Sequence, residues 1–323
     1  AVPALSGDFA KDVISFILIV GLTIVNIFGV NVSKFVNNLI TISKLVPLAL
    51  FIAIGIFFIN GANFTPVFPQ NIYVDGSFAQ AAVLLFFAYT GFEVIAIAAE
   101  DMKNPKKNLP RAIIMCMLLV SVLYMAILAV SIGVLGTDLA NTKAPVQDAF
   151  NVIVGPIGMY IVLVGTLISM GGINFAEAYY APRVATSMAE DGMLPSALAK
   201  RNRYNAPYIA AIVTAIASVL LAWSGSFTTL AAISAVSRFT QYLPTCLAVI
   251  IFRRKWADKA RSYTIPGGYL IPVIAIGTSL WMLAQAQTNQ LLWGLGGCIV
   301  ILPFYYSYWK KKKAGLIKDN DET

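Results

Sequence analysis

The feature that most restricts the fold of this chain is an apolar run that begins at Phe78 and leads into a basic cluster. The run is long enough to cross a bilayer as a helix, since a helix rises about 1.5 Å per residue and the hydrocarbon core is about 30 Å thick. Near its middle, Thr90-Gly91-Phe92-Glu93 places a weak helix former and a carboxylate at bilayer depth. An ionised acid there costs at least about 2.5 kcal/mol. We therefore predict a helix that is broken at Thr90-Gly91, with free backbone groups forming a polar site in the membrane midplane.

The sequence has nine apolar runs long enough to cross a bilayer, counting the one that begins at Phe78, and this number predicts a polytopic membrane protein. Charged residues make up only 12% of the sequence and the mean hydropathy is +0.77, whereas soluble domains carry about 25% charge. Loops with Lys or Arg alternate with loops that have almost none, which places the C-terminus in the cytoplasm and the start of the chain outside. The predicted organisation is a single all-α transmembrane domain, with two spans in residues 12–59, five in 78–252, two in 270–308 and a cytoplasmic tail in 310–323. The fourth span is expected at residues 112–136 and the fifth at 157 to about 180.

The composition argues against several other classes of function. The chain has no histidine, which removes imidazole metal sites and histidine-based acid–base catalysis. No span has two acids in its interior, so we expect no metal, no other cofactor and no enzyme activity. The net charge of +8 is explained by positive loops on one side of the membrane, so we expect no nucleic-acid partner. Single, balanced charges within the spans do not suggest the charge rings of a channel.

Three sequence stretches resemble one transporter family. FAYTGFE followed by NPKKNLPRAI resembles the sixth transmembrane helix and following loop of amino acid permeases of the amino acid–polyamine–organocation superfamily. Residues 37–51, NNLITISKLVPLALF, resemble its fifth helix, and residues 182–195, PRVATSMAEDGMLP, the end of its eighth helix and the next loop. The resemblance implies a fold of two inverted five-helix repeats. It also implies that the chain holds helices four to twelve of twelve, so that the first three are absent.

The resemblance places an amino acid substrate at the helix break. The ammonium group of the substrate would be held by carbonyls freed between Ala88 and Gly91, and Phe87 would close over the substrate. Phe87 is equally well explained as a core or lipid-facing residue. The candidate substrate-binding residues are Phe87, Ala88, Tyr89, Thr90, Gly91, Glu177 and Ser234.

Four charged side chains lie in the interiors of the spans: Lys44, Glu93, Glu177 and Arg238. Because two are positive and two negative, they could pair structurally, or they could line a water-accessible cavity. Glu177 would favour a cationic substrate if it faced the cavity, and would only be neutralised if it paired with Arg238. For Glu93 the resemblance implies a role in the inner gate, with Tyr242 as hydrogen-bond donor. Lys44, Glu93, Tyr242 and Arg238 are the candidates for gating or proton coupling.

Lys44 lies in mid-span with no acid nearby in the sequence. Burial disfavours the charged form of a lysine, so that the side chain could exchange a proton. The resemblance gives it the place of the sodium ion of sodium-coupled relatives. We therefore predict sodium-independent secondary transport of amino acids across the cell membrane, by proton-coupled symport or exchange. The alternative is a polyamine or amino acid/amine antiporter with a cationic substrate. The expected partners are the small-molecule substrate and the lipid bilayer, and the oligomeric state is left open.

Overall fold

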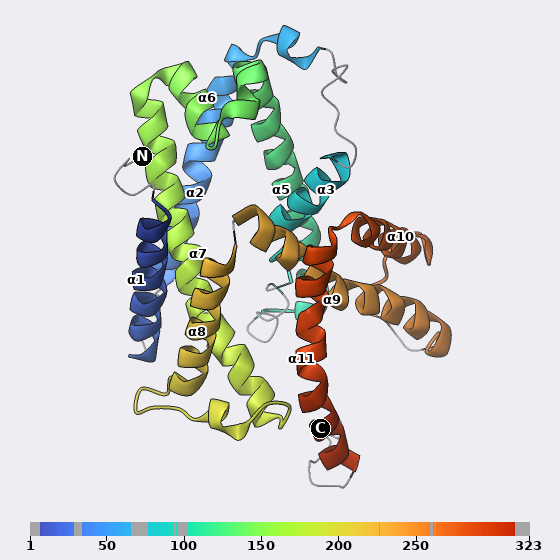
Figure 1. The fold of residues 1–323 in the computed structure, drawn as a ribbon. Helices are drawn as coiled ribbons and strands as arrows, with labels where there is room; N and C mark the ends of the chain where they lie inside the picture. Colours follow the sequence, from blue (N-terminus) through green and yellow to red (C-terminus); the bar gives the residue numbers. More distant parts are fainter. Residues whose placement is uncertain are drawn as a thin grey trace. The chain divides into compact units, whose positions relative to one another are not determined.

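The computed structural model describes residues 7–28, 34–65, 77–93, 95, 102–225, 227–258, 261 and 263–313. These residues form helices joined by turns and include no strand, which confirms the all-α prediction. The α-helices (Figure 1) are α1 (Asp8–Ile27), α2 (Lys34–Gly55), α3 (Ser77–Ala88), α5 (Pro105–Leu135), α6 (Pro145–Val154), α7 (Pro156–Glu190), α8 (Tyr208–Ser224), α9 (Phe227–Lys255), α10 (Leu270–Gln285) and α11 (Thr288–Lys313). Short 3-10 turns are η2 (Ile56–Phe58), η3 (Gly61–Phe64), η4 (Gly136–Asn141) and η5 (Ser196–Ala199).

The helices match the predicted membrane spans. Within the described part of the chain, six helices are long and apolar enough to cross a bilayer, at α1, α2, α5, α7, α9 and α11. Shorter apolar helices, α3, α8 and α10, occupy the three other predicted spans. Large apolar side chains are exposed along these helices, as expected for surfaces that face lipid or other apolar elements. The chain is therefore a multi-pass membrane protein.

Two helices are longer than the sequence predicted. The helix α5 begins at Pro105 and not at Ala112, so the basic residues of the expected loop lie in its first turns. A proline suits a first helical position, because it needs no N–H partner there. The helix α7 continues through Pro182 to Glu190, instead of ending near residue 180. Prolines inside membrane helices are tolerated when neighbouring groups satisfy the freed carbonyl.

The chain divides into two compact units. The first contains residues 1–64, 129–225 and 301–323, and the second contains residues 65–128 and 226–300. Each unit therefore combines segments that are far apart in the sequence, and α5 and α11 contribute to both.

In the first unit, α7 packs against α1, α2, α6 and α8 (Figure 1). Two glycines allow the close approach of α7 to α2. A Cβ atom built on Gly165 would lie 2.6 Å from Cγ of Pro47, and one on Gly172 would lie 2.4 Å from Cγ2 of Ile40. Small residues allow this kind of helix contact in membranes. Gly172 therefore has a packing role, whereas no atom of the described residues lies within 4 Å of a Cβ built on Gly171.

The loop between α7 and α8 is organised by Asn202. Its side-chain oxygen accepts hydrogen bonds from the backbone N–H groups of Tyr204 and Ala206, both at 3.0 Å. Its side-chain amide donates to the carbonyl of Ile27 at 2.7 Å. One side chain therefore shapes the loop and attaches it to the end of α1.

In the second unit, α9 packs against α3 and α10. Its buried face follows a helical spacing and consists of Ala231, Ala232, Ala235, Val236 and Phe239. The ring of Phe86, near the end of α3, stacks on that of Phe239 with 4.8 Å between centroids. This packing places the end of α3 directly beside the middle of α9.

Candidate functional site

The described residues contain the first half of the predicted broken helix and its end. The helix α3 ends at Ala88, and residues 89–93 form turns. The N–H groups of Tyr89 and Thr90 donate to carbonyls three residues back, each at 3.1 Å, which tightens the last turn. Gly91 follows with a φ of +107°, a backbone region that favours glycine and stops the helix. The second half of the predicted broken helix, at residues 96–101, lies outside the described residues.

The carboxylate of Glu93 folds back on the break. One of its oxygens accepts hydrogen bonds from the N–H of Gly91 at 2.9 Å and from the hydroxyl of Tyr242 at 3.2 Å. The other oxygen accepts from the guanidinium of Arg238, with which Glu93 forms an ion pair. The side chain of Glu93 is 16% exposed and that of Arg238 is 34% exposed. Both carboxylate oxygens are bonded and the charge is compensated, which offsets the cost of an acid inside a membrane span.

These contacts bear on two expectations from the sequence. The hydrogen bond expected between Tyr242 and Glu93 is present. The positive charge of Arg238, which the sequence offered as a possible partner for Glu177, is compensated by Glu93. Glu177 itself lies on α7 in the other unit, and its side chain is exposed.

Tyr124 on α5 also contacts the break, and the sequence pattern did not single it out. Its hydroxyl donates to the carbonyl of Ala88 at 3.0 Å, and its ring meets that of Tyr89 edge-on with 5.3 Å between centroids. The hydroxyl of Thr90 donates to the carbonyl of Phe87 at 2.7 Å. The carbonyl of Ala88 is thus not free, contrary to the expectation. A tyrosine in an otherwise apolar span, whose hydroxyl needs a partner when buried, was the available signal.

Phe87 lies on α3 and Ser234 lies on α9, and these two helices of the second unit pack against each other. The half-buried ring of Phe87 packs against a buried cluster of α3 and α9 side chains, formed by Val83, Ala232 and Ala235. This packing agrees with a core role for Phe87. Ser234 is half-buried on α9, one turn before Arg238, and its carbonyl accepts a hydrogen bond from the hydroxyl of Ser237 at 2.8 Å.

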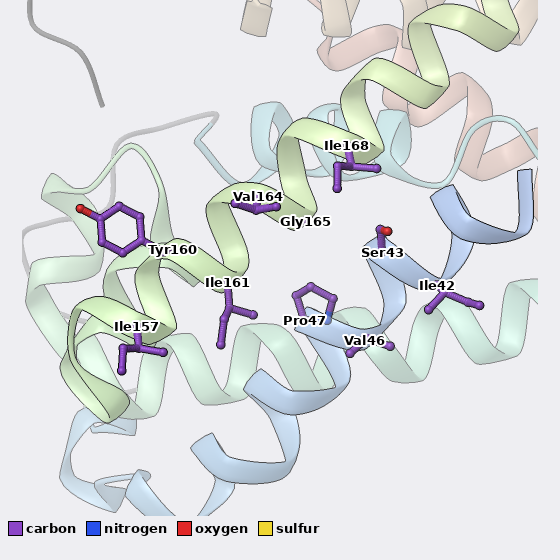
Figure 2. A pocket seen from close by; sticks show the side chains of 10 residues that line it. All are labelled: Ile42, Ser43, Val46, Pro47, Ile157, Tyr160, Ile161, Val164, Gly165 and Ile168. Carbon is purple, nitrogen blue, oxygen red and sulfur yellow. The ribbon is translucent and has the colours of Figure 1, made fainter. Parts of the chain in front are cut away.

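Lys44 lies on α2 in the first unit and is half-buried. Its neighbours Ser43 and Pro47 line a groove of about 620 Å³ between α2 and α7. Figure 2 shows the rest of the lining, which consists of Gly165, Tyr160 and aliphatic side chains from both α2 and α7. A lining of this kind has few groups that could bind the ammonium and carboxylate of an amino acid. The groove is therefore a poor candidate for the substrate site, and the break in α3 is the better one.

Comparisons with known proteins identify the family. A family profile described as amino acid permease matches residues 3–308. The branched-chain amino acid permease BcaP of Bacillus subtilis (strain 168) is 28% identical over 316 residues, 95% of this chain and 66% of the relative. The serine/threonine exchanger SteT of the same organism is 29% identical over 314 residues, 95% of this chain and 71% of the relative.

A methylthioribose transporter of the same organism is 30% identical over 288 residues, 88% of this chain and 61% of the relative. The chain therefore spans 61–71% of the length of these three relatives. The family match covers nearly the whole of the chain and agrees with the three motifs and with the broken helix. The chain belongs to the amino acid permease family.

Proposed function

We propose that this chain forms part of a secondary transporter of amino acids, with its substrate site at the break in α3. The observation that carries the proposal is the end of α3 at Ala88 within an apolar run, followed by a turn in which Glu93 accepts a hydrogen bond from the N–H of Gly91 at 2.9 Å. A discontinuous helix in mid-span is the usual place for a substrate site in transporters. Family membership and the names of BcaP and SteT, an amino acid permease and an amino acid exchanger, support the same function.

In the proposed mechanism, backbone carbonyls between Tyr89 and Gly91 hold the ammonium group of the substrate. The carbonyl of Ala88 contributes to this contact only when the hydroxyl of Tyr124 releases it. Glu93 and Tyr242 act as the gate beside the break. The two compact units support a mechanism of alternating access, because bodies that are well packed internally can move relative to one another.

Transport is proposed to be independent of sodium, with the positive charge of Lys44 in place of a bound sodium ion. Coupling is then to protons, or to the counter-movement of a second amino acid. The distribution of basic loops supports an orientation with the C-terminus in the cytoplasm and a location in the cell membrane.

The test is transport by the complete gene product that contains this chain, reconstituted into liposomes. Counterflow of radiolabelled amino acids should be saturable, should be unaffected by a sodium gradient, and should respond to a pH gradient or to an internal amino acid. Linear, non-saturable ion flux would indicate a channel instead. The absence of exchange for every standard amino acid would refute the proposal.

A further inference from the structure

The ion pair between Glu93 and Arg238 joins the helix break to α9. Glu93 is bonded to Gly91, the residue at which the helix stops, so its charge lies within one hydrogen bond of the proposed substrate site. Among the described residues, no atom lies within 4 Å of a Cβ atom built on Gly91. A ligand beside this backbone would experience the field of the carboxylate.

Without a counter-charge, Glu93 would attract any cation that reached the break. Its side chain is only 16% exposed, and charges that are partly buried are screened much less than charges in water. A substrate with a positively charged side chain would then be favoured over a neutral substrate of the same shape. An unpaired Glu93 would therefore make the site selective for cationic amino acids.

Arg238 removes that preference. Its guanidinium holds one oxygen of Glu93, while the other oxygen is occupied by Gly91 and Tyr242. A second cation that approached Glu93 would gain little from the neutral pair and would be repelled by Arg238 itself.

We propose that Arg238 is the fixed counter-cation of Glu93 and thereby restricts the transporter to amino acids whose side chains carry no positive charge. This inference rests on the proposed function and adds the substrate class to it. The ammonium group that all amino acids share is bound by neutral backbone carbonyls, so its recognition does not depend on the carboxylate.

The experiment compares ligands that differ only in charge. Arginine and citrulline have nearly the same shape, and norleucine has the four-carbon side chain of lysine without its terminal ammonium group. Only arginine and lysine carry a cationic side chain. Binding to the purified complete gene product is measured by the rise in its melting temperature with ligand concentration. The unmodified protein should bind the neutral member of a pair and leucine, and should bind arginine and lysine more weakly.

In Arg238→Gln the preference should shift towards the cationic ligands by on the order of ten-fold or more, the scale of one charged hydrogen bond. Arg238→Lys keeps the positive charge and should keep the exclusion. Adding Glu93→Gln to Arg238→Gln should remove the gained preference, because the attracting carboxylate is then absent.

Arg238→Gln could unfold on extraction, and in that case extraction is repeated with each ligand present. Arginine or lysine should protect this variant and citrulline or norleucine should not, because only a cation replaces the lost charge. Equal protection within a matched pair would overturn the inference. So would an unchanged preference in stable Arg238→Gln, or equal binding of arginine and citrulline by the unmodified protein. If the unmodified protein neither binds nor exchanges any amino acid, the proposed function itself fails.

Discussion

Replacing Glu93 or Arg238 alone by glutamine should destabilise the protein more than breaking an exposed ion pair on a protein surface would. Each single change leaves a charge without its partner, within a span whose surroundings are apolar. The double replacement removes both charges and leaves two amide side chains that can hydrogen-bond to each other. We therefore expect the second substitution to recover part of the stability that the first one removes.

The exposed fractions of the two side chains determine how much stability each substitution should cost. Two unit charges 4 Å apart interact by about 4 kcal/mol at an effective dielectric constant of 20. Glu93 is 16% exposed and Arg238 34% exposed, so water can reach Arg238 more easily when its partner is lost. Arg238→Gln should thus cost about 2–4 kcal/mol and Glu93→Gln about 1–3 kcal/mol, with a coupling of about 1–3 kcal/mol.

The measurement is equilibrium unfolding of the four proteins of the cycle in mixed micelles. The pair between Arg201 and Glu190 provides a matched control, with an N···O distance of 3.0 Å and side chains that are 41% and 49% exposed. Its coupling should be at most about 1 kcal/mol. Additive effects at Glu93 and Arg238, within about 0.5 kcal/mol, would show that the two residues do not form this pair and would refute the reasoning.

Three further substitutions test other parts of the chain. Gly91→Ala should lower the free energy of unfolding by about 1–3 kcal/mol, because Gly91 has a positive φ. Gly171→Ala is the control: Gly171 lies inside a helix with no described atom within 4 Å of an added Cβ, so the change should stabilise the protein by about 0.5–1 kcal/mol. Equal shifts in melting temperature for the two variants would contradict the break. Asn202→Ala, which loses the hydrogen bonds to Ile27, Tyr204 and Ala206, should cost about 1–3 kcal/mol in the same unfolding assay; an unchanged stability would contradict the role of Asn202 in the loop. Lys44→Met should fold, bind substrate more weakly and lose any response of uptake to a pH gradient in liposomes; an intact response would exclude Lys44 from coupling.

The helix break could be predicted because its cause is local. A glycine within an apolar run, followed two residues later by an acid, is incompatible with a continuous lipid-facing helix. In the structure, α3 ends at Ala88 and Gly91 has a positive φ. The contact between Glu93 and Tyr242 was also expected, but from the family resemblance and not from the pattern of residues.

The partner of Arg238 could not be predicted, because its cause is not local. Arg238 and Glu93 are 145 positions apart, and the acid that the sequence suggested as a partner for Arg238 was Glu177. Hydropathy assigns residues to spans but does not order the spans in space. What decides the pairing is the packing of α3 on α9 through Phe86 and Phe239, which brings the residues after the break beside Arg238. The contact of Tyr124 with Ala88 has a similar origin, since it joins two different helices.

The packing of α2 on α7 also separates Lys44 from Glu177, the two remaining charges of the predicted spans. Gly165 lies against Pro47, whereas Gly172, farther along α7, lies against Ile40, earlier on α2, so the two helices are antiparallel. This register places Lys44 between the two contacts and Glu177 beyond the second one. At about 1.5 Å per residue, roughly 15 Å along the helix axes separates the two charges. Lys44 and Glu177 are therefore too far apart to neutralise each other as a contact pair.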